Sequence, residues 1–266
     1  MTSFLAWLSV DERRPSALYF ASDSRRSWPD GRTRDDCIKL FASKTSADIF
    51  AFVGDDITYP ERMLPELCKE LDDGLVPAGQ MTSMYGRNEW VSTQLAVRMP
   101  KQDSHRSFTV FHGSRNSFGM CATFQVIEHS YFGKTMEWKR TELITPLNKS
   151  GAVTVGGSGA ENLDGNVQSW VRHLGQFSRS FFSAFCDALT TASDPLSGGA
   201  PQLLGFGNTG NPIHFGIVTK VGAFYRGEFA EEVPEGTKWR NELFECVNRQ
   251  GNLFKKAQHH ARPKSI

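Results

Sequence analysis

The sequence has no apolar run approaching the roughly 20 residues that a membrane-spanning helix needs. Its first residues also lack the basic segment and small-residue cleavage site of a secretion signal. We therefore expect a cytoplasmic protein with no membrane contact. Neither sign of charge is in excess, because the formal net charge is +1 and the arginines between Arg13 and Arg34 are interleaved with acids. This balance is typical of a solvated surface and indicates no nucleic-acid partner.

Paired cysteines, repeats and low-complexity segments are also absent. The five cysteines are scattered without a Cys-x-x-Cys pair, so the sequence predicts neither a disulfide framework nor a zinc site. We expect no metal and no cofactor, and His259 and His260 fit a solvated tail. With 266 residues, the chain favours one domain over 1–229, followed by a C-terminal extension, 230–266, with a helix over 238–252 and a basic tail.

What the sequence does contain is a succession of strand and helix patterns. Two apolar runs, 4–10 and 17–21, flank a polar turn and predict a β-hairpin. Apolar residues at three- and four-residue steps predict a helix over 59–75, and either one broken helix or two helices around Gly175. This order of elements predicts an α+β fold. The other expected elements are a helix over 89–97 and strands over 37–42, 49–53, 108–112, 120–128, 138–144, 152–155, 201–206, 213–219 and 222–225.

One glycine-rich segment has the spacing of a dinucleotide-binding loop. It reads Gly205-Phe206-Gly207-Asn208-Thr209-Gly210 and follows a predicted strand. That loop requires a helix directly after it, because the helix N-terminus binds the pyrophosphate. Here Pro212 and another strand pattern follow instead. We therefore expect no nucleotide site at this segment.

Five features that are weak individually occur together in one order. Thr2 is one of many small residues found after an initiator methionine, Asp23 could cap a turn, and Lys39 could reach water from a strand edge. A lysine inside an apolar strand otherwise needs a partner for its charge. In chain order the features are Thr2, Asp23-Ser24-Arg25, Lys39, Gly157-Ser158-Gly159, and Asp194 followed by Ser197-Gly198-Gly199.

This combination resembles the catalytic β-type subunits of the proteasome and their bacterial relatives, including the proteasome-like subunit of the bacterial ATP-dependent protease. All of these are N-terminal nucleophile (Ntn) hydrolases. In them an acid-serine-arginine ends the second strand and a lysine follows sixteen residues after the acid, as Lys39 follows Asp23. The resemblance covers about 2–75 and 150–225, and it implies a four-layer αββα sandwich of two antiparallel sheets flanked by helices. The first hairpin is a few residues longer than the family pattern.

The resemblance also implies a set of site residues. With Met1 removed, Thr2 would carry both a hydroxyl and a free α-amine, whose ordinary pKa of roughly 7.7 to 8.0 allows it to accept the hydroxyl proton. A neighbouring Lys39 would lower the pKa of this amine, and Asp23 would hold the lysine. Arg25 would have a structural role. The expected catalytic residues are Thr2, Asp23, Lys39, Ser158, Asp194 and Ser197, with the Gly54 N–H as oxyanion donor.

The sequence thus predicts a threonine-type peptidase that forms an acyl ester on Thr2. The expected partners are a peptide or unfolded-protein substrate, further copies of the chain in a ring, and an ATP-dependent unfoldase. Cys37, Phe41 and Phe52 are candidates for the substrate pocket, although core packing explains them equally well. Two alternatives stay open: an Ntn amidase acting on a small-molecule amide, and a catalytically silent ring or scaffold subunit.

Overall fold

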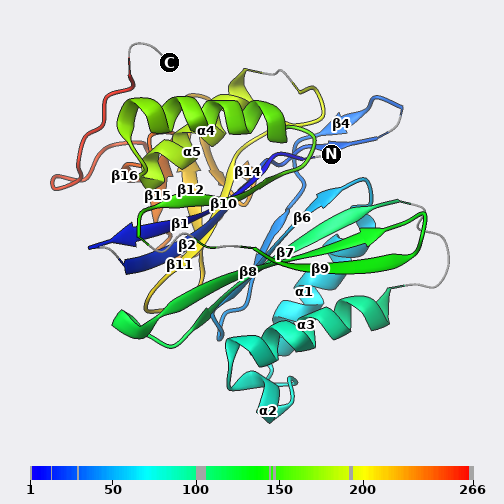
Figure 1. The fold of residues 1–266 in the computed structure, drawn as a ribbon. Helices are drawn as coiled ribbons and strands as arrows, with labels where there is room; N and C mark the ends of the chain where they lie inside the picture. Colours follow the sequence, from blue (N-terminus) through cyan, green and yellow to red (C-terminus); the bar gives the residue numbers. More distant parts are fainter. Residues whose placement is uncertain are drawn as a thin grey trace.

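The chain forms two β-sheets that pack face to face, with helices on their outer sides (Figure 1). The computed structural model describes residues 2–12, 14–28, 30–99, 106–143, 145, 148–191 and 194–263. Within these ranges the predicted mixture of helices and antiparallel sheets is confirmed, and one strand pair is parallel.

The first sheet is built around the predicted N-terminal hairpin, which is apolar on both faces. Leu5 and Trp7 contact helices on the outer side, whereas Phe4, Ala6 and Leu8 contact the second sheet. Burial of both faces explains why the first strand is an almost unbroken apolar run. In spatial order the strands are β10 (Gly151–Gly156), β1 (Phe4–Asp11), β2 (Arg14–Ser22), β11 (Gln202–Gly207), β12 (Ile213–Val218), β13 (Ala223–Tyr225) and β14 (Glu228–Phe229), with β15 (Trp239–Asn241) beside β12 and β16 (Cys246–Val247) beside β15.

The second sheet alternates side chains between the first sheet and a helical layer. On its second strand Ile49 and Ala51 face the first sheet, and Phe50 and Phe52 face the helices. The strands are, in order, β5 (Leu40–Ala42), β6 (Asp48–Gly54), β7 (Phe108–Asn116), β8 (Thr123–Phe132) and β9 (Glu137–Leu143). A separate two-stranded ribbon consists of β3 (Arg26–Ser27) and β4 (Thr33–Arg34).

The helices cover the outer sides of the two sheets. Helices α1 (Thr58–Asp72) and α3 (Met84–Arg98) pack on the second sheet, and α4 (Ala160–Leu174) and α5 (Ser178–Thr190) pack on the first. Gly175, with a φ of 86°, separates α4 from α5, so this stretch forms two helices. Two shorter elements are α2 (Ala78–Met81) and the 3₁₀ helix η1 (Gly119–Cys121).

Several predicted boundaries shift by a few residues. The strand predicted over 37–42 begins only at Leu40, so Lys39 directly precedes β5. The helix expected over 89–97 lies within α3, and the strands expected over 108–112 and 120–128 correspond to β7 and β8. The strand over 138–144 corresponds to β9, except that Ile144 lies outside the described residues. A strand does follow the loop at 208–212, in agreement with the rejection of a dinucleotide site.

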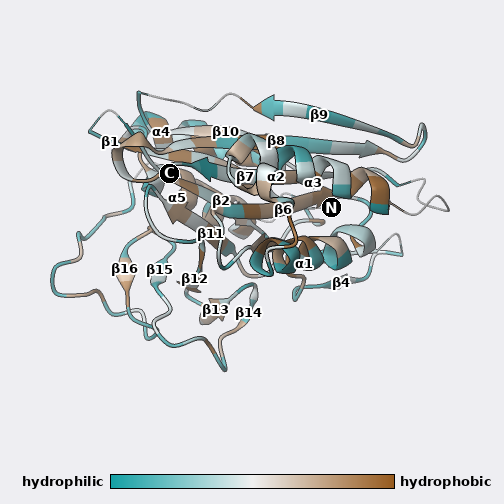
Figure 2. Cartoon of the chain, turned by 90° about the horizontal axis from the view of Figure 1, so that it is seen from below, coloured by the Kyte–Doolittle hydropathy of each residue, from teal (hydrophilic) through white to brown (hydrophobic). Residues whose placement is uncertain are grey.

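The helix predicted over 238–252 is wrong. This segment instead contributes β15, which runs parallel to β12, and β16, which pairs with β15. Trp239 packs over Gly216, where an added Cβ would lie 2.3 Å from the indole ring. In the view of Figure 2, β13 to β16 lie to one side of the two sheets. We call β13 to β16 and their connections the C-terminal lobe; the domain boundary at residue 229 stays a prediction.

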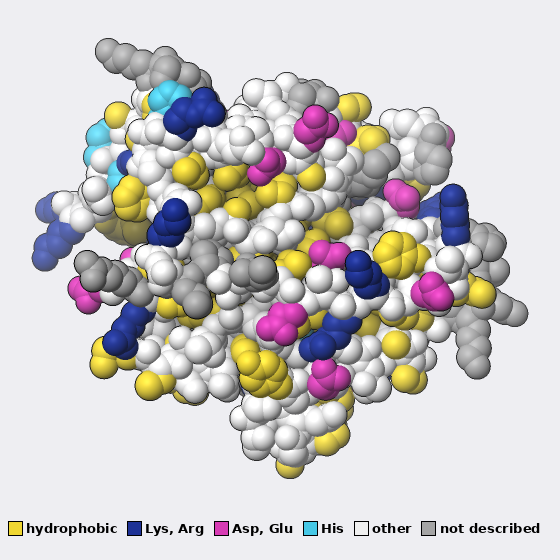
Figure 3. Space-filling view, viewed as in Figure 1, with side chains coloured by type: hydrophobic (Ala, Val, Ile, Leu, Met, Phe, Trp, Pro, Cys, Tyr) yellow, Lys and Arg dark blue, Asp and Glu magenta, His cyan; other side chains and the backbone are white. Residues whose placement is uncertain are grey.

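One face of the molecule shows the balanced charge expected from the sequence. On the face shown in Figure 3, basic and acidic side chains are interspersed. Across the ranges that the structure describes, no helix has the length and apolar character required to span a bilayer.

The burial of His129 on β8 should make the stability of the protein depend on pH. This side chain is 2% exposed, and burial, with smaller effects of His112 and Arg140, lowers its pKa from 6.5 to about 3. Between these values the unfolded state binds more protons than the folded state, so the free energy of unfolding falls as the pH is lowered. In urea unfolding, His129→Gln should lose about 2 kcal/mol less than the wild type between pH 7 and pH 5.

The matched control is His173→Gln, because His173 is exposed on α4. It should lose as much stability as the wild type over the same pH interval. An equal loss in all three proteins would contradict the assignment to His129.

Candidate active site

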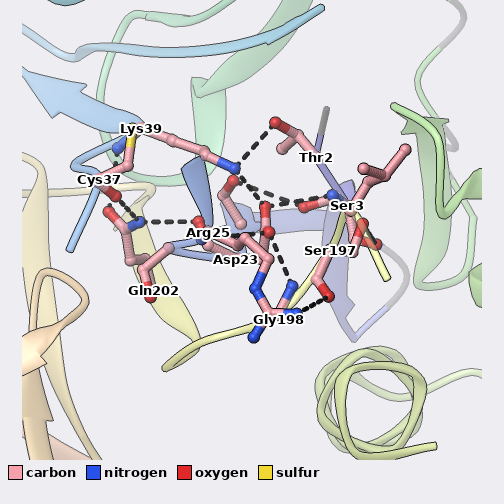
Figure 4. Close-up of polar contacts among 12 residues, drawn as sticks. Thr2, Ser3, Asp23, Arg25, Cys37, Lys39, Ser197, Gly198 and Gln202 are labelled. Atoms are coloured by element: carbon pink, nitrogen blue, oxygen red, sulfur yellow. Dashed lines mark hydrogen bonds and ion pairs between the residues drawn. The ribbon is translucent and has the colours of Figure 1, made fainter. Parts of the chain in front are cut away.

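Thr2, Asp23 and Lys39 meet at the end of the N-terminal hairpin (Figure 4). Phe4 pairs with Ser22 in the β1–β2 register, and the Asp23 N–H donates to the Ser3 carbonyl at 3.2 Å. Lys39 Nζ donates to Thr2 Oγ1 at 2.9 Å and to Asp23 Oδ1 at 2.7 Å. The Lys39 and Asp23 side chains are 1% and 0% exposed, so the ammonium bridges the hydroxyl and the carboxylate away from water.

Three backbone donors hold the Asp23 carboxylate. Ser3 N donates to Oδ1 at 3.2 Å, while Arg25 N and Gly198 N donate to Oδ2 at 3.3 and 3.0 Å. Burial raises the pKa of Asp23 above its usual value, and the Lys39 charge and these hydrogen bonds act against that rise. The carboxylate is therefore fixed in position by its own strand end, by Ser3 and by the Gly198 loop.

Gln202 is a member of this cluster that the sequence did not indicate. Its side chain is 1% exposed, and Nε2 donates to the carbonyls of Asp23 at 2.9 Å and Cys37 at 2.8 Å. The Lys39 N–H donates to Gln202 Oε1 at 3.2 Å. One amide group thus joins the segment that carries Asp23 to the segment that carries Lys39. The only available signal was a polar residue near the start of the strand predicted over 201–206.

Ser158, Asp194 and Ser197 form a second hydrogen-bonded group beside the first. Asp194 Oδ2 accepts from Ser158 Oγ at 2.6 Å and from Ser197 Oγ at 2.8 Å. Partial burial raises the pKa of Asp194, but hydrogen bonds from Ser158, the Leu196 N–H and Ser197 outweigh this effect and lower it. Ser3 Oγ, which the sequence prediction missed, donates to Ser197 Oγ at 3.0 Å. The group therefore extends to the residue next to Thr2.

The glycines around Ser158 allow close approach to the N-terminus. At Gly157, with a φ of +89°, an added Cβ would lie 1.8 Å from the Thr2 carbonyl oxygen. At Gly159, a Cβ would lie 2.1 Å from Ser3 Oγ. Only residues without a side chain can occupy these two positions while the loop lies against Thr2 and Ser3.

Arg25 connects the same loop to Asp35. Its Nε donates to Asp35 Oδ1 at 2.7 Å, and Nη1 donates to the carbonyls of Pro195 at 3.2 Å and Ser197 at 3.4 Å. The guanidinium thereby holds the loop that carries Ser197 and Gly198.

Gly54 ends β6 at a φ of +132°. An added Cβ there would lie 2.5 Å from Phe108 Cα, so the packing of β7 alone requires glycine at this position. No described hydrogen bond joins Gly54 to Thr2, and its role as oxyanion donor stays a prediction.

The three pocket candidates lie in the core beneath α1. Cys37 is 2% exposed, donates to Glu61 Oε1 at 3.2 Å, and has its pKa raised to about 12 by burial. Phe41 and Phe52 stack with ring centroids 6.4 Å apart. Thr2 lines neither of two cavities of about 950 and 820 Å³, although Phe41 borders the larger one. The assignment of Cys37, Phe41 and Phe52 to a substrate pocket stays a prediction.

No cluster of three or more histidine, cysteine, aspartate or glutamate residues suited to a metal ion occurs in the described ranges. The candidate site can hold a buried ammonium against a hydroxyl and a carboxylate. It can also orient a second carboxylate through two serines.

Comparisons with known proteins bear on the fold. No model of a known protein family matches the chain. A search of curated proteins also found no match. Among solved structures, the chain is similar to "Anbu (ancestral beta-subunit)" from Yersinia bercovieri, with a TM-score of 0.52 and 10% identity over 79% of this chain and 86% of that one. It is also similar to eukaryotic HslV from Trypanosoma brucei, with a TM-score of 0.44 and 12% identity over 76% of this chain and 98% of that one.

The first of these similarities, at its low identity, concerns the fold alone. It supports, for this chain, the fold of that ancestral β-subunit.

Proposed function

We propose that this chain is a proteasome-like threonine peptidase, in which Thr2 becomes the N-terminal nucleophile once Met1 is removed. The observation that carries the proposal is the position of Lys39 Nζ, which lies 2.9 Å from Thr2 Oγ1 and 2.7 Å from Asp23 Oδ1. A hydroxyl that only packed in a core would not need a buried ammonium beside it. The buried ion pair of Lys39 and Asp23 costs free energy to remove from water, and such a pair is therefore a candidate for a functional role.

In the proposed reaction the free α-amine of Thr2 accepts the Oγ1 proton while Oγ1 attacks the carbonyl carbon of the substrate. The positive charge of Lys39 disfavours protonation of that amine and therefore lowers the pKa of the amine toward pH 7. The proton then passes to the leaving amine, the peptide bond breaks, and an acyl ester remains on Oγ1. Water activated by the same amine hydrolyses the ester and restores Thr2.

The other residues would orient these groups. Asp194 with Ser158 and Ser197 is proposed to hold the amine or the attacking water, since the hydrogen-bonded group reaches Ser3 beside Thr2. The Gly54 N–H is proposed as donor to the tetrahedral oxyanion, which is typically worth about 2.7 to 4 kcal/mol for one donor. Cys37, Phe41 and Phe52 stay candidates for the substrate pocket.

The assembly belongs to the same proposal. The order helix pair, sheet, sheet, helix pair supports assignment to the four-layer αββα sandwich of Ntn hydrolases. We propose a cytoplasmic ring of identical chains that degrades peptides or unfolded proteins, with an ATP-dependent unfoldase as a candidate partner. The ring, the substrate class and the unfoldase partner rest on the motifs shared with proteasome β-type subunits.

The proposal is tested on purified protein by intact mass, hydrolysis and labelling. The mass should be lower by one methionine, a panel of peptides should be cleaved, and a mechanism-based acylating probe should label Thr2. Active protein that retains Met1 would contradict the mechanism. Cleavage of small acyl amides but of no peptide would assign an Ntn amidase instead. Processed protein that hydrolyses nothing and resists the probe would be a silent ring or scaffold subunit.

A further inference from the structure

The larger cavity, of about 950 Å³, lies between helix α1 and the C-terminal lobe. Cys68 and Asp72 of α1 border one side, and His214, Tyr225 and Arg226 border the other. It is a space between two parts of the chain, and one of its walls is formed by the β13–β14 hairpin.

Arg226 occupies an unfavourable backbone position at the tip of that hairpin. Tyr225 pairs with Glu228, so Arg226 and Gly227 form a two-residue turn, with φ values of 55° and 91°. Turns with two positive φ angles favour asparagine, aspartate or glycine at the first position, because a longer side chain is strained there. An arginine at this position suggests that its side chain has a use that offsets the strain.

The guanidinium of Arg226 has no partner in the described part of the chain. Its Nε is buried without a hydrogen bond, and no described carboxylate forms an ion pair with it. Arg226 lines the cavity together with Cys68 of α1 and His214. A buried N–H without an acceptor is unfavourable, and a charged one more so.

Asp72 of helix α1, which also lines the cavity, already accepts hydrogen bonds from other residues. Asp72 Oδ1 accepts hydrogen bonds from Ser43 Oγ, Lys44 N, Thr45 N and Thr45 Oγ1. Lys44, Lys69 and Lys238 also border the cavity, and they match in number its acids, Asp72, Asp73 and Glu235. Arg226 is therefore the cation in excess, and it faces a space large enough for a small molecule.

We propose that this cavity binds a small molecule through an oxyanion, a carboxylate or a phosphate group, held by the Arg226 guanidinium. The planar fork of arginine matches both groups with two parallel N–H donors. The apolar part of the ligand would lie against Phe41, Ile213 and Tyr225, which line the same space. This site is separate from Thr2 and does not depend on the proposed peptidase activity.

The hairpin turn that would hold the ligand packs against the rear of the candidate active site. Gly227 follows Arg226 and packs on Ser24 and Gln202, where an added Cβ would lie 2.7 Å from Ser24 Cβ and 3.2 Å from Gln202 Nε2. Gln202 in turn bonds the segments of Asp23 and Lys39. An anion that holds the Arg226 side chain in place would therefore also hold the turn that packs behind Asp23 and Lys39.

The test measures binding of inorganic phosphate and of benzoate to the full chain by calorimetry, at constant ionic strength set with chloride. We expect saturable binding of at least one of them, and the one that binds distinguishes phosphate from carboxylate ligands. In Arg226→Asn the affinity should fall at least about tenfold, because the charged donors are lost. The melting temperature without ligand should be unchanged or higher, because asparagine suits a positive φ.

The matched control is Arg14→Gln, which removes the same charge from an exposed position outside the cavity. Its anion affinity should equal that of the wild type. Absence of saturable binding by both anions, or equal binding by Arg226→Asn and the wild type, would overturn the proposal. A clear fall in the melting temperature of Arg226→Asn would overturn it too, since the guanidinium would then serve the fold itself.

Discussion

Thr2→Ala is expected to reduce peptide hydrolysis by at least about 10³-fold, because alanine offers no oxygen to form the acyl ester. The fold should persist, since the variant loses only a hydroxyl group, a methyl group and one hydrogen bond from Lys39. The measurement is the rate of peptide cleavage by processed variant and wild type, accompanied by far-ultraviolet circular dichroism and a melting curve.

Thr2→Ser is the control for this experiment. Serine keeps the hydroxyl and the free amine, so measurable hydrolysis and labelling by the acylating probe should remain. Peptide cleavage by Thr2→Ala at the wild-type rate would rule out Thr2 as nucleophile, whatever the activity of the serine variant.

Lys39→Met should remove activity and also destabilise the fold by about 3 to 5 kcal/mol at neutral pH. The reason is that Asp23, 0% exposed, loses the ammonium 2.7 Å away and is left as an unpaired buried charge. Urea unfolding of variant and wild type gives the difference. The exposed Lys139→Met on β9 is the matched control and should change stability by no more than about 0.5 kcal/mol.

The loss of unfolding free energy in Lys39→Met should be smaller at acidic pH. The pKa of Asp23 is already raised by burial, and loss of Lys39 removes the main opposing effect. A carboxyl group whose pKa is higher in the folded state contributes stability below its unfolded pKa of about 3.8 and loses it as the pH rises through the folded value. The variant should therefore lie closer to the wild type at pH 5 than at pH 8. A deficit independent of pH would show that packing, and not the unpaired charge, causes the loss.

The meeting of Thr2, Asp23 and Lys39 was predicted from the resemblance to proteasome β-type subunits, and local structure explains part of it. Two adjacent strands joined by a turn bring their far ends together, so residues 3 and 23 must lie side by side. Lys39 carries a charge in an apolar run, and a buried charge needs a partner. Both arguments use only neighbouring segments and elementary electrostatics.

Gln202 and the C-terminal lobe were not predictable in this way. The contacts of Gln202 join it to residues more than 160 positions earlier, and a single glutamine at the start of a strand has no spacing pattern. Trp239 fits a helical pattern over 238–252, yet it pairs in parallel with Gly216 and fills the space that this glycine leaves. In both cases, contacts between segments far apart in the sequence determine the structure, and local sequence patterns do not reveal such contacts.

The contacts of Gln202 and Gly198 have a consequence for the order in which the protein is made. Asp23 and Lys39 are synthesised early, but their hydrogen-bonding partners Gly198 and Gln202 follow 163 to 179 residues later. At about 5 to 20 residues per second, a nascent chain spends on the order of ten seconds without them. During translation Thr2 and Lys39 therefore lack part of the framework that orients them. Under the proposed mechanism, an unfinished chain on the ribosome would be protected from its own activity.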